Sequence, residues 1–273
     1  MPTSAQRKFS RALELLHPLE AEISDFSLSA AYRFTIEQGE WANGVSRCTI
    51  VAEENQPPPD DWPLRVGEII QNLRSALDHA VWSAWRSVPT NDGEGRHTAL
   101  PIAVDSQAFT DQAWRLEGVP ATTQQSIERI QPYVVSANRP EADGLVILNR
   151  LAIIDKHRTL TTVAAAVAPT AIGHDLRVEI DEWDHGTFTP LGSGRNVVSS
   201  FTARSAQPIE PGDLQPMYGY QIQIEGYGSG VLSLFVRRVF EVLWEIENGE
   251  HPPPGAPYPI RLPERYVRIG EPL

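Results

Sequence analysis

The chain has a single cysteine, Cys48, among its 273 residues. One cysteine excludes an intrachain disulfide and a zinc site built on cysteine ligands. It also favours a reducing compartment, so we expect a cytoplasmic protein. Long apolar runs are missing too: residues 163–168 form the longest candidate, far short of the roughly 20 residues that cross a bilayer. Residues 1–8 lead into an amphipathic pattern and not into the apolar core of a signal peptide.

Lysine is almost absent, and acidic residues outnumber basic ones. Lys8 and Lys156 are the two lysines, and the formal net charge is -12 at pH 7. Binding along a nucleic acid depends on Lys and Arg side chains that neutralise phosphates. The composition therefore excludes coating of DNA, but it is compatible with a small basic pocket.

The spacing of apolar residues predicts four main helices, over residues 6–24, 62–86, 143–158 and 231–248. Pro18 is expected to break or kink the first of them. Helix 62–86 has one apolar stripe, whereas helix 143–158 is apolar nearly all round and is expected to be the central buried helix, capped by Asp143. A shorter helix is predicted from Thr122 or Thr123 to Gln131.

Alternating and β-branched segments predict the strands. Strands 31–37 and 47–52 form a hairpin around Asn43-Gly44. Further strands are expected near residues 159–168, 175–182, 186–190, 197–204 and 217–225. The predicted fold class is α+β, a helical bundle packed with an antiparallel β-sheet. We expect a single domain over residues 1–250, with a helical motif region at 62–158, a strand-rich region at 159–227, a closing helix at 231–248 and a proline-rich extended tail at 251–273.

Helix 62–86 carries polar residues that a core helix does not need: Arg74, Asp78 and His79. At about 100° per residue, Arg74 and His79 are roughly 140° apart around the helix, so they do not share a face. Arg74 and Asp78 do share one, at positions i and i+4. The structural interpretation is an Arg74–Asp78 ion pair beside the stripe, with His79 bonded to a neighbouring element.

The motif Arg74-Ser-Ala-Leu-Asp-His79 on a helix resembles the HEPN superfamily, whose nucleases carry Arg-x4–6-His. The resemblance implies metal-independent RNA cleavage without a cofactor, possible roles in phage defence or a toxin system, and a homodimer that joins its motifs through helix 62–86. It implies that His79 is the acid or base, that Arg74 stabilises phosphate charge, and that Asp78 belongs to the same catalytic group. Imidazole titrates near neutrality and a guanidinium matches phosphate geometry, so these residue types suit those roles.

A second polar cluster ends helix 143–158: Asp155, Lys156, His157 and Arg158, with Arg150 two turns earlier. Lys156, His157, Arg158 and Arg150 are candidates for binding RNA phosphates. The structural alternative is that cations complement the dipole at the end of the helix and that Arg158 pairs with a buried Asp155. The combination of both clusters is similar to a set of uncharacterised bacterial proteins of actinobacterial type, which implies no activity.

Two other classes of function stay open. Asp78, His79, Asp155 and His157 are the right residue types for a His/carboxylate metal enzyme, although no helical ligand pair sets the geometry. A non-catalytic binding or interaction protein, whose polar pairs only fix helix packing, is compatible with the acidic charge. The lead hypothesis is a HEPN-like ribonuclease or RNA-binding element.

Overall fold

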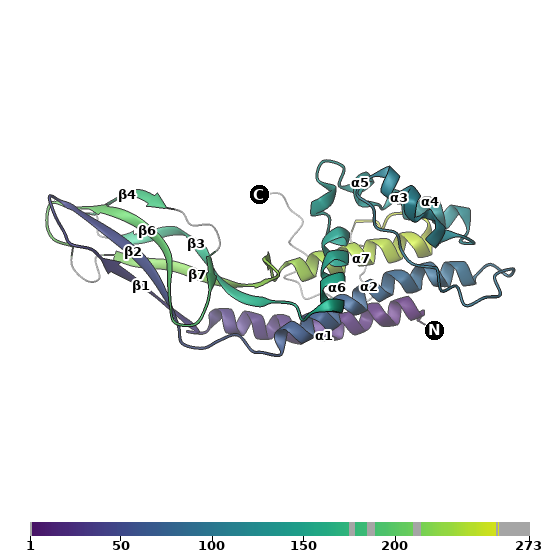
Figure 1. Cartoon of the computed structure of the whole chain (residues 1–273), viewed down its shortest axis with the longest axis horizontal. Helices are drawn as coiled ribbons and strands as arrows, with labels where there is room; N and C mark the ends of the chain where they lie inside the picture. The colour runs from purple at the N-terminus through teal and green to yellow at the C-terminus, as the bar shows by residue number, and fades with distance from the viewer. Residues whose placement is uncertain (1, 175–177, 185–188, 210–213, 255, 257–273) are drawn as a thin grey trace. The chain divides into compact units, whose positions relative to one another are not determined.

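The computed structural model describes residues 2–174, 178–184, 189–209, 214–254 and 256. The chain divides into two compact units, each made of separate segments. The helical unit comprises Met1–Pro18, Leu64–Leu160 and Gly230–Leu273, and the strand-rich unit comprises Leu19–Pro63 and Thr161–Ser229. The predicted α+β class is confirmed (Figure 1). This division does not test the prediction of one domain over residues 1–250, since two compact units can belong to one folding domain.

Three long helices supply most of the helical unit: α2 (Trp62–Arg86), α6 (Gly144–His157) and α7 (Val231–Asn248). The predicted stripe of α2 is buried, including Val66, Ile70 and Leu73. Asp143 caps α6 as expected, because its carboxylate accepts the backbone N–H of Leu145 at 2.8 Å. α7 ends at Gly249, whose φ of 78° is the left-handed conformation that glycine adopts at helix C-termini.

Helix α1 (Ser4–Leu28) contributes to both units. It continues through Pro18, so of the expected break or kink at this residue the break is wrong. A proline in a helix interior removes one backbone hydrogen bond, and the buried residues before and after it, such as Leu16 and Leu19, supply packing on both sides. Apolar burial along the helix therefore outweighs the lost bond.

Short helices connect α2 to α6, and most of them were not predicted from the sequence. They are α3 (Ser106–Gln112), the 3-10 turn η1 (Ala113–Leu116), α4 (Ala121–Arg129), α5 (Pro132–Val135) and the 3-10 turn η2 (Pro140–Ala142). α4 is the helix predicted at 122–131. The others span one or two turns, too short to display a helical repeat of apolar residues.

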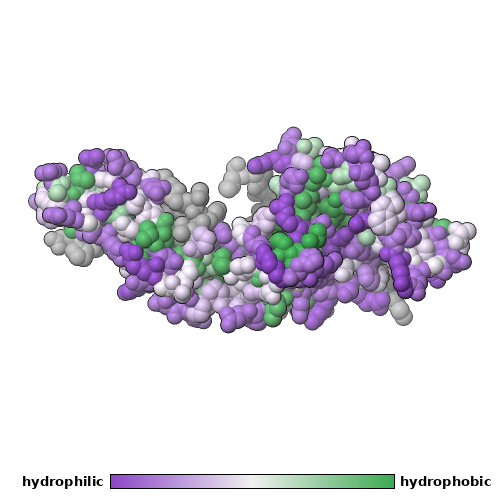
Figure 2. Space-filling model, in the orientation of Figure 1, coloured by the Kyte–Doolittle hydropathy of each residue, from purple (hydrophilic) through white to green (hydrophobic). Residues whose placement is uncertain are grey.

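Central burial of α6 holds for only one side of the helix. Leu145, Leu148 and Leu151 are buried, but Ile153 is 50% exposed. Val134, Val135 and Leu234 are other large apolar side chains exposed in this unit. Figure 2 shows apolar side chains, in green, gathered among hydrophilic ones on the helices. The nearly continuous apolar sequence of α6 therefore overstated its burial.

The strands form two four-stranded antiparallel sheets within the described residues, where one had been predicted. The first has the order β1-β2-β6-β4 and the second β5-β3-β7-β8. Their bounds are β1 Tyr32–Gln38, β2 Val45–Glu54, β3 Thr162–His174, β4 Glu179–Asp184, β5 Thr189–Leu191, β6 Arg195–Arg204, β7 Leu214–Ile224 and β8 Tyr227–Gly228. The predicted hairpin is confirmed, because β1 pairs with β2 around Asn43 and Gly44, which both have positive φ.

The strand-rich unit has its own apolar core. Cys48, Ile50 and Phe201 lie in one buried cluster with Ala203 and Leu214. Burial raises the pKa of the Cys48 thiol. Among the described residues, no helix is long and apolar enough to cross a membrane.

Candidate functional site

Arg74 and Asp78 form an ion pair on α2, as the structural interpretation predicted. The Nη1 of Arg74 lies 2.5 Å from the Oδ1 of Asp78, and the two side chains are 11% and 35% exposed. The Nε of Arg74 donates to the Oδ1 of Asn149 on α6 at 3.2 Å, and its Nη2 donates to the Leu100 carbonyl at 3.1 Å. Asp78 also accepts the backbone N–H of Leu100 at 2.9 Å. Each nitrogen of this guanidinium therefore already has an acceptor.

His79 does not join this cluster. It is half-buried, and no hydrogen bond or ion pair of its ring is found in the described part of the chain. The expected bond to a neighbouring element is therefore not observed. Helical spacing puts His79 on the same side of α2 as Ser75 and the partly exposed Trp82. Its position on the helix is therefore on a different face of α2 from Arg74.

The basic residues near the end of α6 are all exposed: Arg150, Lys156, His157 and Arg158. Arg150 lies 3.9 Å from the carboxylate of Glu141, and Arg158 donates to the Thr159 carbonyl at 3.2 Å. Arg74 bonds to Asp78, Asn149 and the Leu100 carbonyl, and none of these acceptors belongs to this basic group. Lys156, His157 and Arg158 stand at the helix C-terminus, where cations complement the dipole.

Asp155 turns toward α2, and its partner there is an amide. Gln71 donates from Nε2 to the Oδ2 of Asp155 at 3.0 Å and to the Ala152 carbonyl at 2.9 Å. The sequence had suggested Arg158 as the partner, and this was wrong. Among the residues that the structure describes, no Lys, Arg or His pairs with Asp155. A neutral donor thus holds an ionisable carboxylate between two helices.

A cavity of about 420 Å³ opens beside this carboxylate. Three helices of the helical unit line it: α1, α2 and α6. The lining consists mostly of polar side chains, namely Lys8, Leu64, Glu68, Gln71, Asn72, Ser75 and Asp155. Lys8 donates to the Oδ1 of Asn72 at 3.4 Å, and Asn72 donates to the Glu68 carbonyl at 2.8 Å.

Gly67 on α2 makes room for Asp155. A Cβ at position 67 would lie 2.2 Å from the Oδ1 of Asp155. Glycine inside a helix costs about 1 kcal/mol relative to alanine. The interior glycine of helix 62–86 was the one feature of the sequence that could have indicated this close approach. No pattern in the sequence indicated that Lys8 and Gln71 would lie beside Asp155, because they are far from it along the chain.

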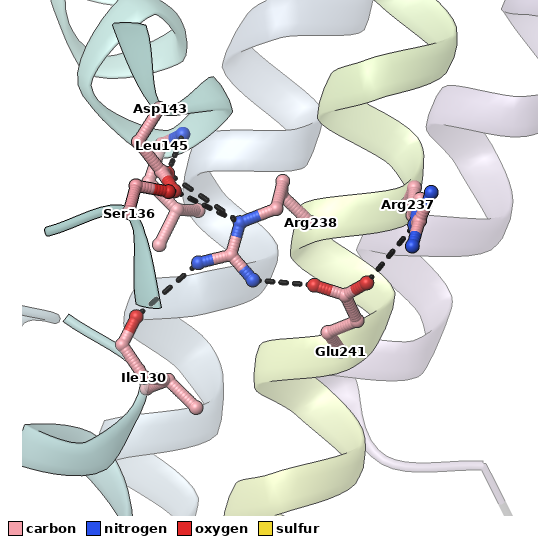
Figure 3. Close-up of polar contacts among 7 residues, drawn as sticks. All are labelled: Ile130, Ser136, Asp143, Leu145, Arg237, Arg238 and Glu241. Carbon is pink, nitrogen blue, oxygen red and sulfur yellow. Dashed lines mark hydrogen bonds and ion pairs between the residues drawn. The ribbon is translucent and has the colours of Figure 1, made fainter. Parts of the chain in front are cut away.

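A second dense polar group lies where α7 meets the start of α6 (Figure 3). Arg238 is 10% exposed and its Nε lies 3.4 Å from the carboxylate of Asp143, while its Nη2 donates to the Ile130 carbonyl at 3.2 Å. Its Nη1 pairs with Glu241, which also accepts a hydrogen bond from Arg237 at 3.1 Å. The two arginines and the two carboxylates balance in charge, and each buried group has a partner. We therefore interpret this network as one that holds α6 and α7 together, and not as a ligand site.

Metal ligands do not gather in the described residues. No group of three or more His, Cys, Asp or Glu side chains could hold one ion there. Asp78, His79, Asp155 and His157, the set suggested by the sequence, therefore do not form a site together.

Comparison of the chain with protein-family models, with curated proteins and with solved structures finds no match.

Proposed function

We propose that this protein binds a small polar ligand in the cavity between α1, α2 and α6. The observation that carries the proposal is the convergence of polar side chains from three helices on one space of about 420 Å³. This volume lies within the range of about 300–1,000 Å³ that ligand pockets occupy, and the polar lining of this solvent-open pocket suits a polar ligand. The proposal is a specific form of the binding protein that the sequence left open.

The contacts of Arg74 favour binding over catalysis at α2. A phosphate clamp needs guanidinium N–H groups that are available to the ligand. In the helical unit Asp78, Asn149 and Leu100 accept three of the five N–H groups of Arg74, and the side chain is only 11% exposed. Moving this side chain toward RNA would leave Asp78 without its cation.

A panel of small compounds tests the proposal, monitored by saturation-transfer NMR on the full chain. The panel holds aliphatic amines, carboxylates, amino acids and phosphate esters. We expect at least one class to bind to the wild type and to lose binding in Ser75→Phe, which adds a ring to the cavity wall. Thr122→Phe, on the exposed side of α4, is the matched control and should bind as the wild type does. The proposal fails if no class binds, or if Ser75→Phe binds unchanged.

The HEPN-like ribonuclease is a second candidate, and one observation favours it. His79 is accessible and makes no hydrogen bond within the described residues, so its ring is available as an acid or base. The candidate assigns RNA phosphates to Lys156, His157, Arg158 and Arg150, whose side chains are exposed near the end of α6. A homodimer through α2 would have to supply a second cation near His79, because Arg74 of the same chain faces elsewhere.

Cleavage of mixed RNA in excess EDTA tests this candidate. The wild type is compared with His79→Ala and Arg74→Ala, and circular dichroism checks that both variants are folded. A nuclease centred on α2 predicts cleavage by the wild type alone. Cleavage that survives both substitutions would remove the site from α2, and an inert wild type would leave the ligand-binding proposal as the better account.

A further inference from the structure

The chemical class of the ligand follows from how the charges of the cavity are arranged, and this inference rests on the proposed function. Three charged side chains line the cavity: Lys8, Glu68 and Asp155. Lys8 comes from α1 and Asp155 from α6, while α2 bonds to both through Asn72 and Gln71 and contributes Glu68. Opposite charges thus stand on two different walls of one space.

None of these three charges is neutralised within the described residues. Lys8 has only the Asn72 amide oxygen, at 3.4 Å, so most of its ammonium donors have no protein acceptor. Asp155 has only the Gln71 amide, and Glu68 forms no ion pair there with Lys8 or any other cation. An ion pair between Lys8 and either carboxylate would need a separation of 4.0 Å or less. The lysine and the two acids are therefore too far apart to satisfy one another.

The position of Asp155 requires a glycine inside α2, which lowers the stability of that helix. Gly67 weakens the helix, and it is the residue that allows the carboxylate to lie against the backbone. Gln71 fixes the orientation by donating to Oδ2. An anion that is held by a neutral donor and faces an open cavity is suited to accept a cation from a ligand.

We propose that the cavity binds a small zwitterion, a molecule with a primary ammonium group at one end and a carboxylate at the other. The ammonium lies between Asp155 and Glu68, and the carboxylate accepts from Lys8. Leu64, which is 60% exposed at this cavity, covers the alkyl chain between the two ends. One such molecule supplies a counter-charge to each wall.

Three ω-amino acids of increasing length are the probes: glycine, 4-aminobutyrate and 6-aminohexanoate. Hexylamine and hexanoate each keep one of the two charges and serve as single-charge controls. Isothermal titration calorimetry on the full chain measures each affinity at low ionic strength. We expect one of the three zwitterions to bind at least tenfold more tightly than both controls.

Two substitutions separate the two ends of the ligand. Asp155→Asn keeps an acceptor for Gln71 but removes the charge, and Lys8→Gln removes the ammonium. Each should weaken zwitterion binding about tenfold, the effect of losing one charge-assisted hydrogen bond. Asp111→Asn is the matched control, because Asp111 is also a carboxylate held by a glutamine amide, from Gln107 at 2.8 Å, and it lies outside the cavity.

The outcomes distinguish this inference from the proposed function. If hexylamine or hexanoate binds as tightly as every zwitterion, the zwitterion is wrong and a cavity ligand of single charge remains. Equal binding by the wild type, Asp155→Asn and Lys8→Gln would also overturn the inference. If Asp155→Asn unfolds, Lys8→Gln on the surface of α1 and Gly67→Ala, which displaces the carboxylate, decide the same question.

Discussion

Two polar regions lie along the contact between α2 and α6, and they differ in how their charges are partnered. Around Arg74, a cation, a carboxylate and an amide satisfy one another in a half-buried cluster. Around Asp155, the carboxylate has an amide partner, and Lys8 stands on another wall of an open cavity. The sequence motif marks the first region, whereas in the second neither Lys8 nor Asp155 has a counter-charge within the described residues. A polar residue on a core helix indicates a site only when its bonding capacity is still unused.

The largest change in the free energy of unfolding is expected when Arg74, the cation paired with Asp78, is removed. Arg74→Ala leaves Asp78 without its counter-charge and leaves Asn149 and the Leu100 carbonyl without a donor. Because the arginine side chain is 11% exposed, we expect a loss of about 3 kcal/mol in the free energy of unfolding, within the range for breaking largely buried pairs. Urea denaturation measures it.

Arg237→Ala is the comparison for that experiment. Arg237 also pairs with a carboxylate four residues away on its helix, Glu241, but its side chain is 59% exposed. We expect a change of about 0.5 kcal/mol or less for this exposed pair. Equal losses for both arginines would contradict the distinction between a buried cluster and a surface pair.

Substitution of Gly67 should change the free energy of unfolding by a smaller amount. The sign of this change should depend on whether Asp155 is present. In the wild type, Gly67→Ala places a Cβ 2.2 Å from the Oδ1 of Asp155, and the clash should outweigh the gain in helix propensity. We expect a destabilisation of about 1 kcal/mol, against a gain of about 1 kcal/mol for the same change in an Asp155→Ala background. A double-mutant cycle by urea denaturation measures both. Stabilisation in both backgrounds would mean that Asp155 does not restrict this position.

In the strand-rich unit, burial favours the neutral form of an ionisable side chain, Tyr32, in contrast to the charged groups around Arg74 and Asp155. The pKa of Tyr32 is raised to about 12, mainly by burial and in smaller part by the negative charge of Glu54 and by the neighbouring Tyr220. The folded pKa lies above the unfolded one, so this stability is present below about pH 10 and is lost as the pH rises toward 12. Tyr32→Phe should therefore lose less stability than the wild type between pH 10 and 12. Phenolate absorbance should show one tyrosine fewer titrating near pH 12 in the variant.

The contacts that the sequence could predict are local ones. Asp143 as a cap and Arg74–Asp78 as a pair follow from spacings of two and four residues, and the stripe of α2 follows from its period. Lys8–Asn72 and Gln71–Asp155 join residues 64 and 84 positions apart, and no periodicity encodes such partners. The same reason explains the two sheets. Alternation identifies a strand but does not say which strand it pairs with.

The smallest effect is expected at an exposed pair in the strand-rich unit, Glu37 with Arg195. The hydrogen bond from Arg195 is the main reason that the pKa of Glu37 lies below its ordinary value of 4.5. A lowered folded pKa gives stability that is present above the unfolded value and disappears as the pH falls through the folded one. Both side chains are about half exposed, so water screens most of this attraction. Glu37→Gln should therefore shift the melting temperature only slightly at pH 7 and not at all in strong acid. A large shift at pH 7 would mean that having a partner is sufficient for stability, and burial would no longer explain why Arg74 differs from a surface arginine.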